Sequence, residues 1–177
     1  MKIVILNQAK NHHKYLIKRL SKYFSIAAIV IEKKPLEPKF DTFHPYENEQ
    51  DIYEKEVLLN NEKINLSHYG DLYECENIND SKIFLTISKI NPDIILTVGT
   101  NLIKKPLVDL CPQGFINLHG GDSQYYRGLD SFLWSMYHED FSRLVVTLHH
   151  LNNKLDDGDI ILQKQIRLNK RLHIHKL

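Results

Sequence analysis

Three short, uninterrupted apolar runs constrain the fold of this chain more than any other feature. They are KIVIL at residues 2–6, IAAIVI at 26–31 and IILTV at 94–98, and β-branched side chains dominate each of them. Strands with one exposed face alternate apolar and polar residues, whereas strands covered on both faces read as continuous apolar runs. The runs therefore predict buried strands of a parallel sheet.

Helical periodicity fills much of the sequence between and after these runs. Apolar spacing and capping residues predict helices over residues 12–24, 50–62, 80–90 and 129–138. Further strands are predicted at 115–118, 143–151 and 159–168, and proline-rich residues 33–50 predict an irregular segment. Strands that alternate with helices indicate an α/β domain with a mostly parallel sheet and helices on both faces. In such sheets ligands bind at the carboxyl ends of the strands.

Length and charge narrow the class of protein. The 177 residues predict a single domain over 1–177, and 23 Lys and Arg against 22 Asp and Glu give no basic face for a nucleic-acid partner. The start, MKIVILNQAK, is too short an apolar run for a signal peptide or a membrane span, which predicts a cytoplasmic protein. His173 and His175 alternate without a third ligand in view, so no metal site is predicted.

Glycines are distributed unevenly along the chain. None precedes Gly70, which excludes a dinucleotide-binding turn after the first strand. The Walker, GxSxG and HExxH patterns are absent as well. Six of the seven glycines lie between residues 99 and 158, among clustered polar side chains. We therefore expect the chemistry of the protein in that region.

The stretch FINLHGG, residues 115–121, ends a predicted strand in polar groups. A lone histidine there is more often a hydrogen-bonded strand-end residue than a catalytic one. Side chains two apart in a strand share a face, however, so Asn117 and His119 point the same way. An amide and an imidazole that converge on one spot are a candidate oxyanion site.

A second polar cluster lies in LHHLNNKLDDGDIILQ, residues 148–163. A hairpin turn at the Asp-Gly step accounts for Asp157 and Gly158. It does not account for Asp156, which follows the apolar Leu155. Asp156 is therefore a third candidate for the site.

In this order and spacing, INLHGG, YYRG, VTLH and LDDGDIILQ resemble the folate-dependent formyltransferase family, which includes enzymes that formylate glycinamide ribonucleotide, methionyl-tRNA and amino sugars. The resemblance covers roughly residues 91–165. It implies the Rossmann-like formyltransferase fold, with two late strands joined by the turn that holds the catalytic aspartate. It also implies N10-formyltetrahydrofolate as co-substrate and Asn117, His119 and Asp156 as the catalytic triad.

The resemblance further implies two binding regions. Folate contacts are expected at Asn101, Leu102, Ile103, Leu155 and Asp157. For residues 101–110 the start of an ordinary surface helix remains the alternative. Contacts to the amine substrate are expected at Gly120, Gly121, Tyr125, Tyr126 and Arg127. For the two tyrosines simple packing of the loop is the alternative.

The amine that receives the formyl group is inferred by elimination. The turn after the first strand lacks the glycine with which glycinamide ribonucleotide transformylase binds phosphate, and the chain lacks the basic character of methionyl-tRNA formyltransferase. The Gly120–Gly121 step resembles members that act on nucleotide-linked amino sugars, which predicts such a sugar of surface polysaccharide as the partner. Alternatives are a shortened folate-binding domain without transfer activity, another amine, or water, because the family's C-terminal segment looks missing or very short. A homodimer remains open.

Overall fold

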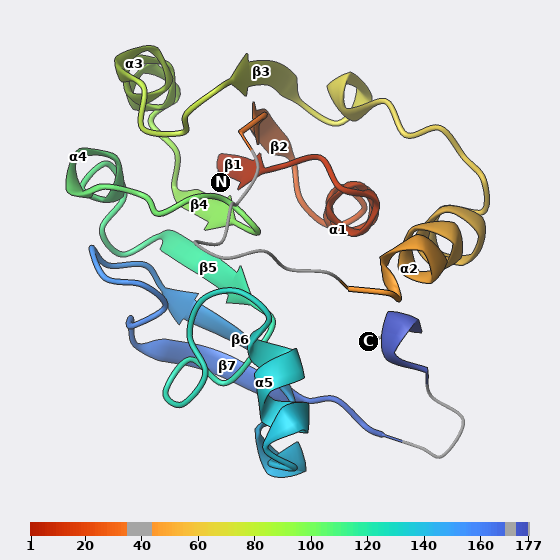
Figure 1. Cartoon of the computed structure of the whole chain (residues 1–177). Helices are drawn as coiled ribbons and strands as arrows, with labels where there is room; N and C mark the ends of the chain where they lie inside the picture. The colour runs from red at the N-terminus through yellow and green to blue at the C-terminus, as the bar shows by residue number, and fades with distance from the viewer. Residues whose placement is uncertain (35–43, 169–172, 177) are drawn as a thin grey trace.

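A computed structural model of the chain describes residues 1–34, 44–168 and 173–176 (Figure 1). Within these residues, seven strands form one sheet in the order β3-β2-β1-β4-β5-β6-β7. The strands are β1 (Ile3–Asn7), β2 (Ile26–Glu32), β3 (Asp71–Cys75), β4 (Ile94–Thr97), β5 (Phe115–His119), β6 (Val145–His150) and β7 (Ile160–Gln165). The pairs from β3 to β5 are parallel, and β5–β6 and β6–β7 are antiparallel. The predicted mostly parallel α/β sheet is confirmed.

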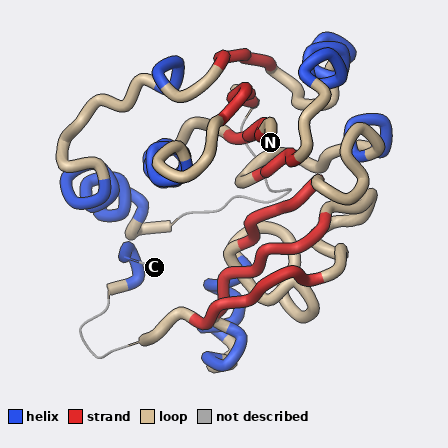
Figure 2. The backbone as a smooth tube through the Cα atoms, turned by 180° about the vertical axis from the view of Figure 1, so that it is seen from behind, coloured by secondary structure: helices blue, strands red, loops and turns tan. Residues whose placement is uncertain are grey.

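Helices cover the parallel part of the sheet on both sides. The α-helices are α1 (Asn11–Leu20), α2 (Glu47–Tyr53), α3 (Ser81–Ile90), α4 (Lys105–Val108) and α5 (Ser131–Tyr137). A π-helical turn, Glu54–Leu58, continues α2, and short 3-10 turns lie at Leu66–His68, Phe141–Arg143 and Ile174–Lys176. Figures 1 and 2 show α1 on one side of the sheet and α3 with α4 on the other.

The core explains why the strand sequences are continuously apolar. Val4 and Leu6 of β1 pack with side chains of α3 and α4 in one buried cluster. Ile3 and Ile5 point to the opposite face and pack with Ile17 of α1 in a second cluster. Because neighbouring residues of a strand face opposite sides, a strand between two helical layers has no polar face.

Three elements differ from the sequence-based expectations. The edge strand β3 went unpredicted, because DLYEC carries exposed acidic residues and contains no apolar run. The first helix ends at Leu20 rather than at residue 24, and the chain stays non-helical at 101–104, just before α4. Half of the predicted irregular segment, residues 35–43, lies outside the described residues, and α2 already begins at Glu47 within the other half. None of these differences concerns β5 or the connection between β6 and β7.

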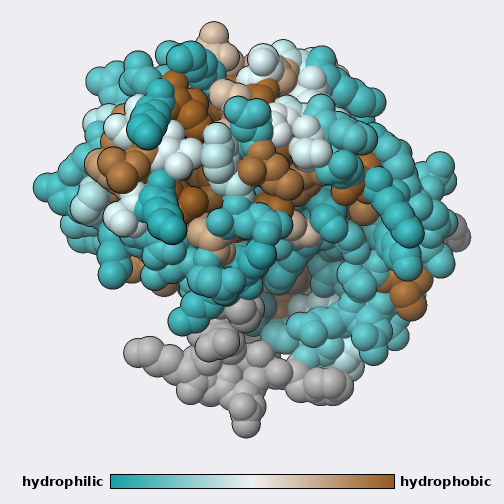
Figure 3. Space-filling model, turned by 90° about the horizontal axis from the view of Figure 1, so that it is seen from above, coloured by the Kyte–Doolittle hydropathy of each residue, from teal (hydrophilic) through white to brown (hydrophobic). Residues whose placement is uncertain are grey.

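The molecular surface next to the β3 edge is mostly hydrophilic. Seen from above, hydrophobic side chains show through only in separate patches between hydrophilic ones (Figure 3). Leu72 of β3 is 37% exposed. None of the helices within the described ranges has the length and apolar character needed to cross a membrane.

Phe115 begins β5 and is fully buried in the cluster beneath α3 and α4. We expect Phe115→Ala to lower the free energy of unfolding by about 3–5 kcal/mol, because it removes buried apolar surface and leaves a cavity. Urea denaturation followed by circular dichroism measures the loss. Phe141→Ala is the matched control, since Phe141 is 48% exposed. Equal losses in the two variants would contradict this description of the core.

Candidate active site

A pocket of about 480 Å³ lies at the carboxyl ends of the parallel strands. Residues of α1, of the segment after β4, of the end of β5 and of the β6–β7 connection line it. The volume falls within the range typical of small-molecule sites. In the sheet, β1 lies between β2 and β4. The strands that follow β1 are therefore added toward one edge of the sheet up to β3 and toward the other edge from β4 on. Such a switch point is where open α/β sheets bind ligands.

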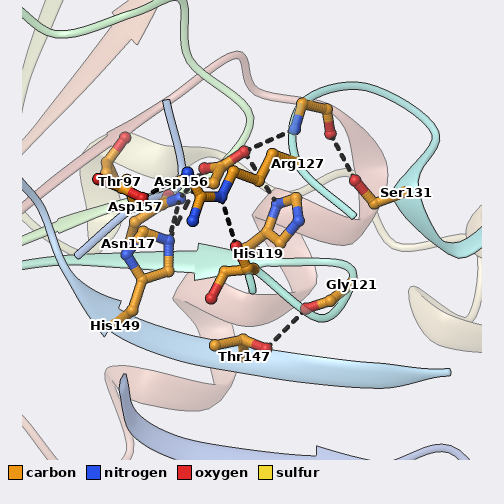
Figure 4. Close-up of polar contacts among 12 residues, drawn as sticks. Thr97, Asn117, His119, Gly121, Arg127, Ser131, Thr147, His149, Asp156 and Asp157 are labelled. Carbon is orange, nitrogen blue, oxygen red and sulfur yellow. Dashed lines mark hydrogen bonds and ion pairs between the residues drawn. The ribbon is translucent and has the colours of Figure 1, made fainter. Parts of the chain in front are cut away.

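The pocket brings together the three residues of the expected triad. Asn117 and His119 come from the end of β5, and Asp156 comes from the connection between β6 and β7 (Figure 4). Asn117 Nδ2 donates to Asp156 Oδ1 at 3.0 Å, and His119 Nδ1 lies 3.5 Å from Asp156 Oδ2. The backbone N–H of Gly128 donates to the same Oδ2 at 2.8 Å. Residues 39 positions apart thus share one polar cluster.

The carboxyl of Asp156 is held in its ionised form. Burial raises its pKa, but the polar contact with His149, the charge of His119 and the N–H of Gly128 together lower the pKa below its usual value. Its side chain is only 11% exposed, so these contacts are poorly screened by water. The result is a fixed negative charge beside His119.

His119 is buried between two hydrogen-bond acceptors. Its Nδ1 faces the carboxylate of Asp156, and its Nε2 lies 3.0 Å from the backbone oxygen of Tyr126. A carbonyl oxygen only accepts, so Nε2 carries a proton in this arrangement. When both nitrogens carry protons, the ring donates at both ends. The surroundings therefore suit a histidine that serves as a hydrogen-bond donor.

His149 belongs to the same cluster, although the sequence analysis gave it no role. It is 1% exposed, its Nδ1 donates to the carbonyl of His150 at 2.8 Å, and its Nε2 lies 3.1 Å from Asn117 Nδ2. With a proton on Nδ1 alone, Nε2 accepts a hydrogen bond from the amide of Asn117. With a proton on Nε2 as well, this nitrogen donates toward Asp156 Oδ1, which lies 3.7 Å away. The antiparallel register pairs Asn117 with His149. His149 is the last residue of the VTLH motif. The motif did not indicate its neighbour, whereas the pairing of β6 with β5 places His149 next to Asn117.

The residues expected to bind folate divide into two groups. Asn101, Leu102, Ile103 and Leu155 line the pocket. Asp157 is not among the lining residues and forms ion pairs with Arg127 and, at 3.4 Å, with Lys154. Asp157 therefore lies at the outer side of the turn that carries Asp156.

The two glycines after His119 have different surroundings. Gly120 lines the pocket, and a Cβ built there meets no atom within 4 Å. A Cβ at Gly121 would lie 2.5 Å from Ser131 Cβ and 3.1 Å from His119 Nε2. The carbonyl of Gly121 also accepts a hydrogen bond from Thr147 Oγ1 at 2.6 Å. Gly120 is open to a ligand, whereas Gly121 is needed for close packing beside His119.

The other expected substrate residues lie outside the pocket lining. Tyr125 is 61% exposed, and the guanidinium of Arg143 lies 3.4 Å from the centre of its ring. Tyr126 contacts His119 through its backbone oxygen. Arg127 pairs with Asp157, and its Nε donates to the carbonyl of Ser123 at 2.6 Å. In this structure these three side chains support the loop around the site.

His13 forms part of the pocket wall, and the sequence analysis did not single it out. It is 2% exposed, and its Nδ1 accepts from the backbone N–H of Gln8 at 3.3 Å. Burial, together with the charges of His12 and Lys10, lowers the pKa of His13 to about 3. The ring lies close to Gly99, where a Cβ would come within 2.8 Å of it. His13 is thus a neutral side chain at the switch point.

The lowered pKa of Asp156 predicts a pH-dependent contribution to stability. This contribution is complete above the ordinary value of 3.8 and is lost as the pH falls through the lower pKa of the folded state. We therefore expect the difference in unfolding free energy between the wild type and Asp156→Asn to shrink below about pH 4. Urea denaturation from about pH 6 to about pH 3 measures it. Asp159→Asn, which changes an exposed residue before β7, is the control. A difference for Asp156→Asn that stays constant with pH would contradict the prediction.

Comparisons with known proteins find curated relatives of part of the chain. The chain is 30% identical over 108 residues to methionyl-tRNA formyltransferase of Finegoldia magna, an alignment that covers 60% of this chain and 34% of that protein. It is 29% identical over 119 residues to the bifunctional polymyxin resistance protein ArnA of Wigglesworthia glossinidia brevipalpis, with 67% of this chain and 18% of that protein covered. The chain thus spans about a third or less of these curated relatives.

Solved structures show the same fold. Phosphoribosylglycinamide formyltransferase of Anaplasma phagocytophilum superposes with a TM-score of 0.66 at 14% identity, covering 99% of this chain and 76% of the other. A formyltetrahydrofolate deformylase of Pseudomonas syringae gives a TM-score of 0.64 at 14% identity, covering 99% of this chain and 53% of the other. The model of the formyl transferase family matches residues 1–177. The chain therefore belongs to the formyl transferase family, as the four sequence motifs predicted.

Proposed function

We propose that this protein transfers a formyl group from N10-formyltetrahydrofolate to the amine of a nucleotide-linked amino sugar. The observation that carries the proposal is the convergence of Asn117, His119 and Asp156 in one pocket. Two hydrogen-bond donors and an ionised carboxylate are the groups that an acyl transfer of this kind requires. Family membership supports formyl transfer, and the amine is the finer part of the proposal.

In the proposed reaction the amine nitrogen forms a bond to the formyl carbon, and the bond between that carbon and N10 breaks. Negative charge develops on the formyl oxygen, and Asn117 and His119 stabilise it by donating hydrogen bonds. The amine loses a proton, which reaches N10 of the leaving folate. Asp156 orients His119 and helps a water to carry that proton.

The donors have to change partners before they can act. In the structure, Nε2 of His119 faces the Tyr126 carbonyl, and the amide nitrogen of Asn117 is shared between His149 and Asp156. Catalytic hydrogen bonds are often misaligned in the free enzyme and form only with substrate. Substrate binding therefore has to release His119 from Tyr126 and one N–H of Asn117 from its present acceptor.

Two features, a contact at the start of α1 and open space at Gly120, favour an amino sugar over a ribonucleotide phosphate. The backbone N–H of His12, in the first turn of α1, donates to Glu54 Oε2 at 3.2 Å. Burial raises the pKa of Glu54, but hydrogen bonds from His12 and Gln50 and the charge of His12 lower it by more, so Glu54 is ionised. A carboxylate there repels a phosphate. The open space at Gly120 leaves room for a large amine beside His119.

Incubation with N10-formyltetrahydrofolate and a panel of uridine and thymidine diphosphate amino sugars tests the proposal. A mass gain of one formyl group on a sugar supports it. Formate release without any formylated sugar would indicate a hydrolase and contradict it. Folate binding without turnover would indicate a binding domain and contradict it as well.

The triad predicts a set of inactive but folded variants. We expect Asn117→Ala, His119→Asn and Asp156→Ala each to lower kcat by roughly a hundredfold or more, because each removes a donor or the group that orients one. Formylated product is quantified by mass spectrometry, and circular dichroism checks folding. Asp159→Asn is the control and should keep near-normal rates. Near-normal rates in the three triad variants would refute the assigned roles.

The open space at Gly120 allows a test of where the amine binds. We expect Gly120→Leu to raise the KM for the amino sugar at least about tenfold while folding is kept, because the new side chain fills open space beside His119. Gly120→Ala, which adds one methyl group, is the matched control and should change KM little. Initial rates at varied sugar concentration give the KM. An unchanged KM in Gly120→Leu would place the amine elsewhere.

A further inference from the structure

Glu32 is a buried acid that the proposed mechanism does not use. It ends β2, is 2% exposed, and forms no ion pair within the parts of the chain that the structure describes. Its Oε1 accepts from the backbone N–H of Ile78 at 2.9 Å, and its Oε2 accepts from the backbone N–H of Asn101 at 2.8 Å. Burying a carboxylate is costly unless hydrogen bonds satisfy it, so both contacts matter for the fold around it.

Asn79 holds the same segment from the other side. Its Oδ1 accepts from the backbone N–H of Lys104 at 2.7 Å, and its Nδ2 donates to the carbonyl of Leu102 at 3.0 Å. The loop that carries Asn79 is in turn tied to Glu32 through Ile78. Glu32 and Asn79 therefore clamp residues 101–104 at three backbone groups.

The clamp leaves three backbone groups of this segment without a partner among the described residues. Across the described residues, no hydrogen bond uses the N–H of Leu102, or the N–H or the carbonyl of Ile103. Both residues line the pocket, and residues 101–104 are neither helix nor strand. A fixed, non-regular backbone with free donors and an acceptor suits a flat heterocycle that carries both kinds of group on its edge.

We propose that Glu32 and Asn79 are positioning residues that hold residues 101–104 in the conformation that binds the pterin ring of the folate, a role that rests on the proposed function. Neither side chain has to touch the folate. Glu32 acts through the backbone of Asn101, and Asn79 acts through Leu102 and Lys104. Their effect is on folate affinity, not on the chemical step.

Two conservative variants test this role. Glu32→Gln keeps the volume but turns an NH₂ group toward one of the two N–H donors. We expect it to weaken binding of 5-formyltetrahydrofolate, a stable folate, and to raise the KM for N10-formyltetrahydrofolate, each by roughly tenfold to a hundredfold, with kcat nearly unchanged. Asn79→Asp keeps the acceptor for Lys104 and loses the donor to Leu102, so we expect the same direction of change. Isothermal titration calorimetry and steady-state kinetics give these values.

Glu74→Gln is the matched control, because Glu74 lies on the neighbouring strand β3, is half exposed and pairs with Lys33. It should leave folate affinity unchanged. Faster hydrogen exchange of the Asn101 amide in Glu32→Gln than in Glu74→Gln would support the clamp directly.

The outcomes separate the two proposals. Folate binding by the wild type with unchanged affinity in both variants would overturn the positioning role alone. So would a fall in kcat at unchanged KM. A wild type that does not bind 5-formyltetrahydrofolate would overturn the proposed function together with this inference. If Glu32→Gln fails to fold, Asn79→Asp decides the question by the same measurements.

Discussion

The antiparallel pairing of β6 with β5 is the constraint on which the candidate site depends. The sheet is parallel from β3 to β5, and β6 runs the opposite way, so β6 begins near His119 and ends with His150 beside Ile116, near the start of β5. The connection that follows β6 leaves from there and folds back along β5 before β7 begins. That connection carries Asp156 to Asn117 and His119, and the register sets His149 opposite Asn117. The antiparallel register and the path of the connection after β6 together assemble the polar cluster.

Buried acids fix the loops around this cluster. Asp156 binds the backbone of Gly128, Glu32 binds those of Ile78 and Asn101, and Glu54 binds that of His12. In each case a carboxylate accepts N–H groups from a loop or a helix start, where backbone donors lack regular partners. Among the described residues, no buried side-chain nitrogen or oxygen is left without a hydrogen bond. The loops are therefore specified by polar contacts, and they hold the pocket where the apolar core ends.

The sequence predicted the parts of the structure that depend on local patterns. Continuous apolar runs identified β1, β2 and β4, because a strand buried on both faces needs apolar side chains at nearly every position. The motifs predicted the family, and they predicted Asn117, His119 and Asp156 as a candidate triad, which the structure brings into one pocket. His149, His13 and Glu32 were missed for a different reason: the place of each in the site depends on pairing or packing between distant segments, which local sequence patterns do not reveal. The edge strand β3 was not predicted, because its side chains stay exposed or half-buried at the edge of the sheet and its sequence therefore contains no apolar run.

Two different parts of the chain serve the two proposed functions of the pocket. Residues 101–104 are proposed to bind folate, and the triad of Asn117, His119 and Asp156 is proposed to catalyse the transfer. Glu32 and Asn79 bind backbone groups of residues 101–104, whereas the side chains of Asn117 and His119 face protein acceptors. In the proposed folate site, a segment fixed in this way lowers the entropic cost of binding the co-substrate. In the proposed mechanism, Asn117 and His119 stabilise an oxyanion only after substrate has displaced their present acceptors. Such an order would favour transfer to the amine over transfer to water, because water alone has too few contacts to release His119 from Tyr126.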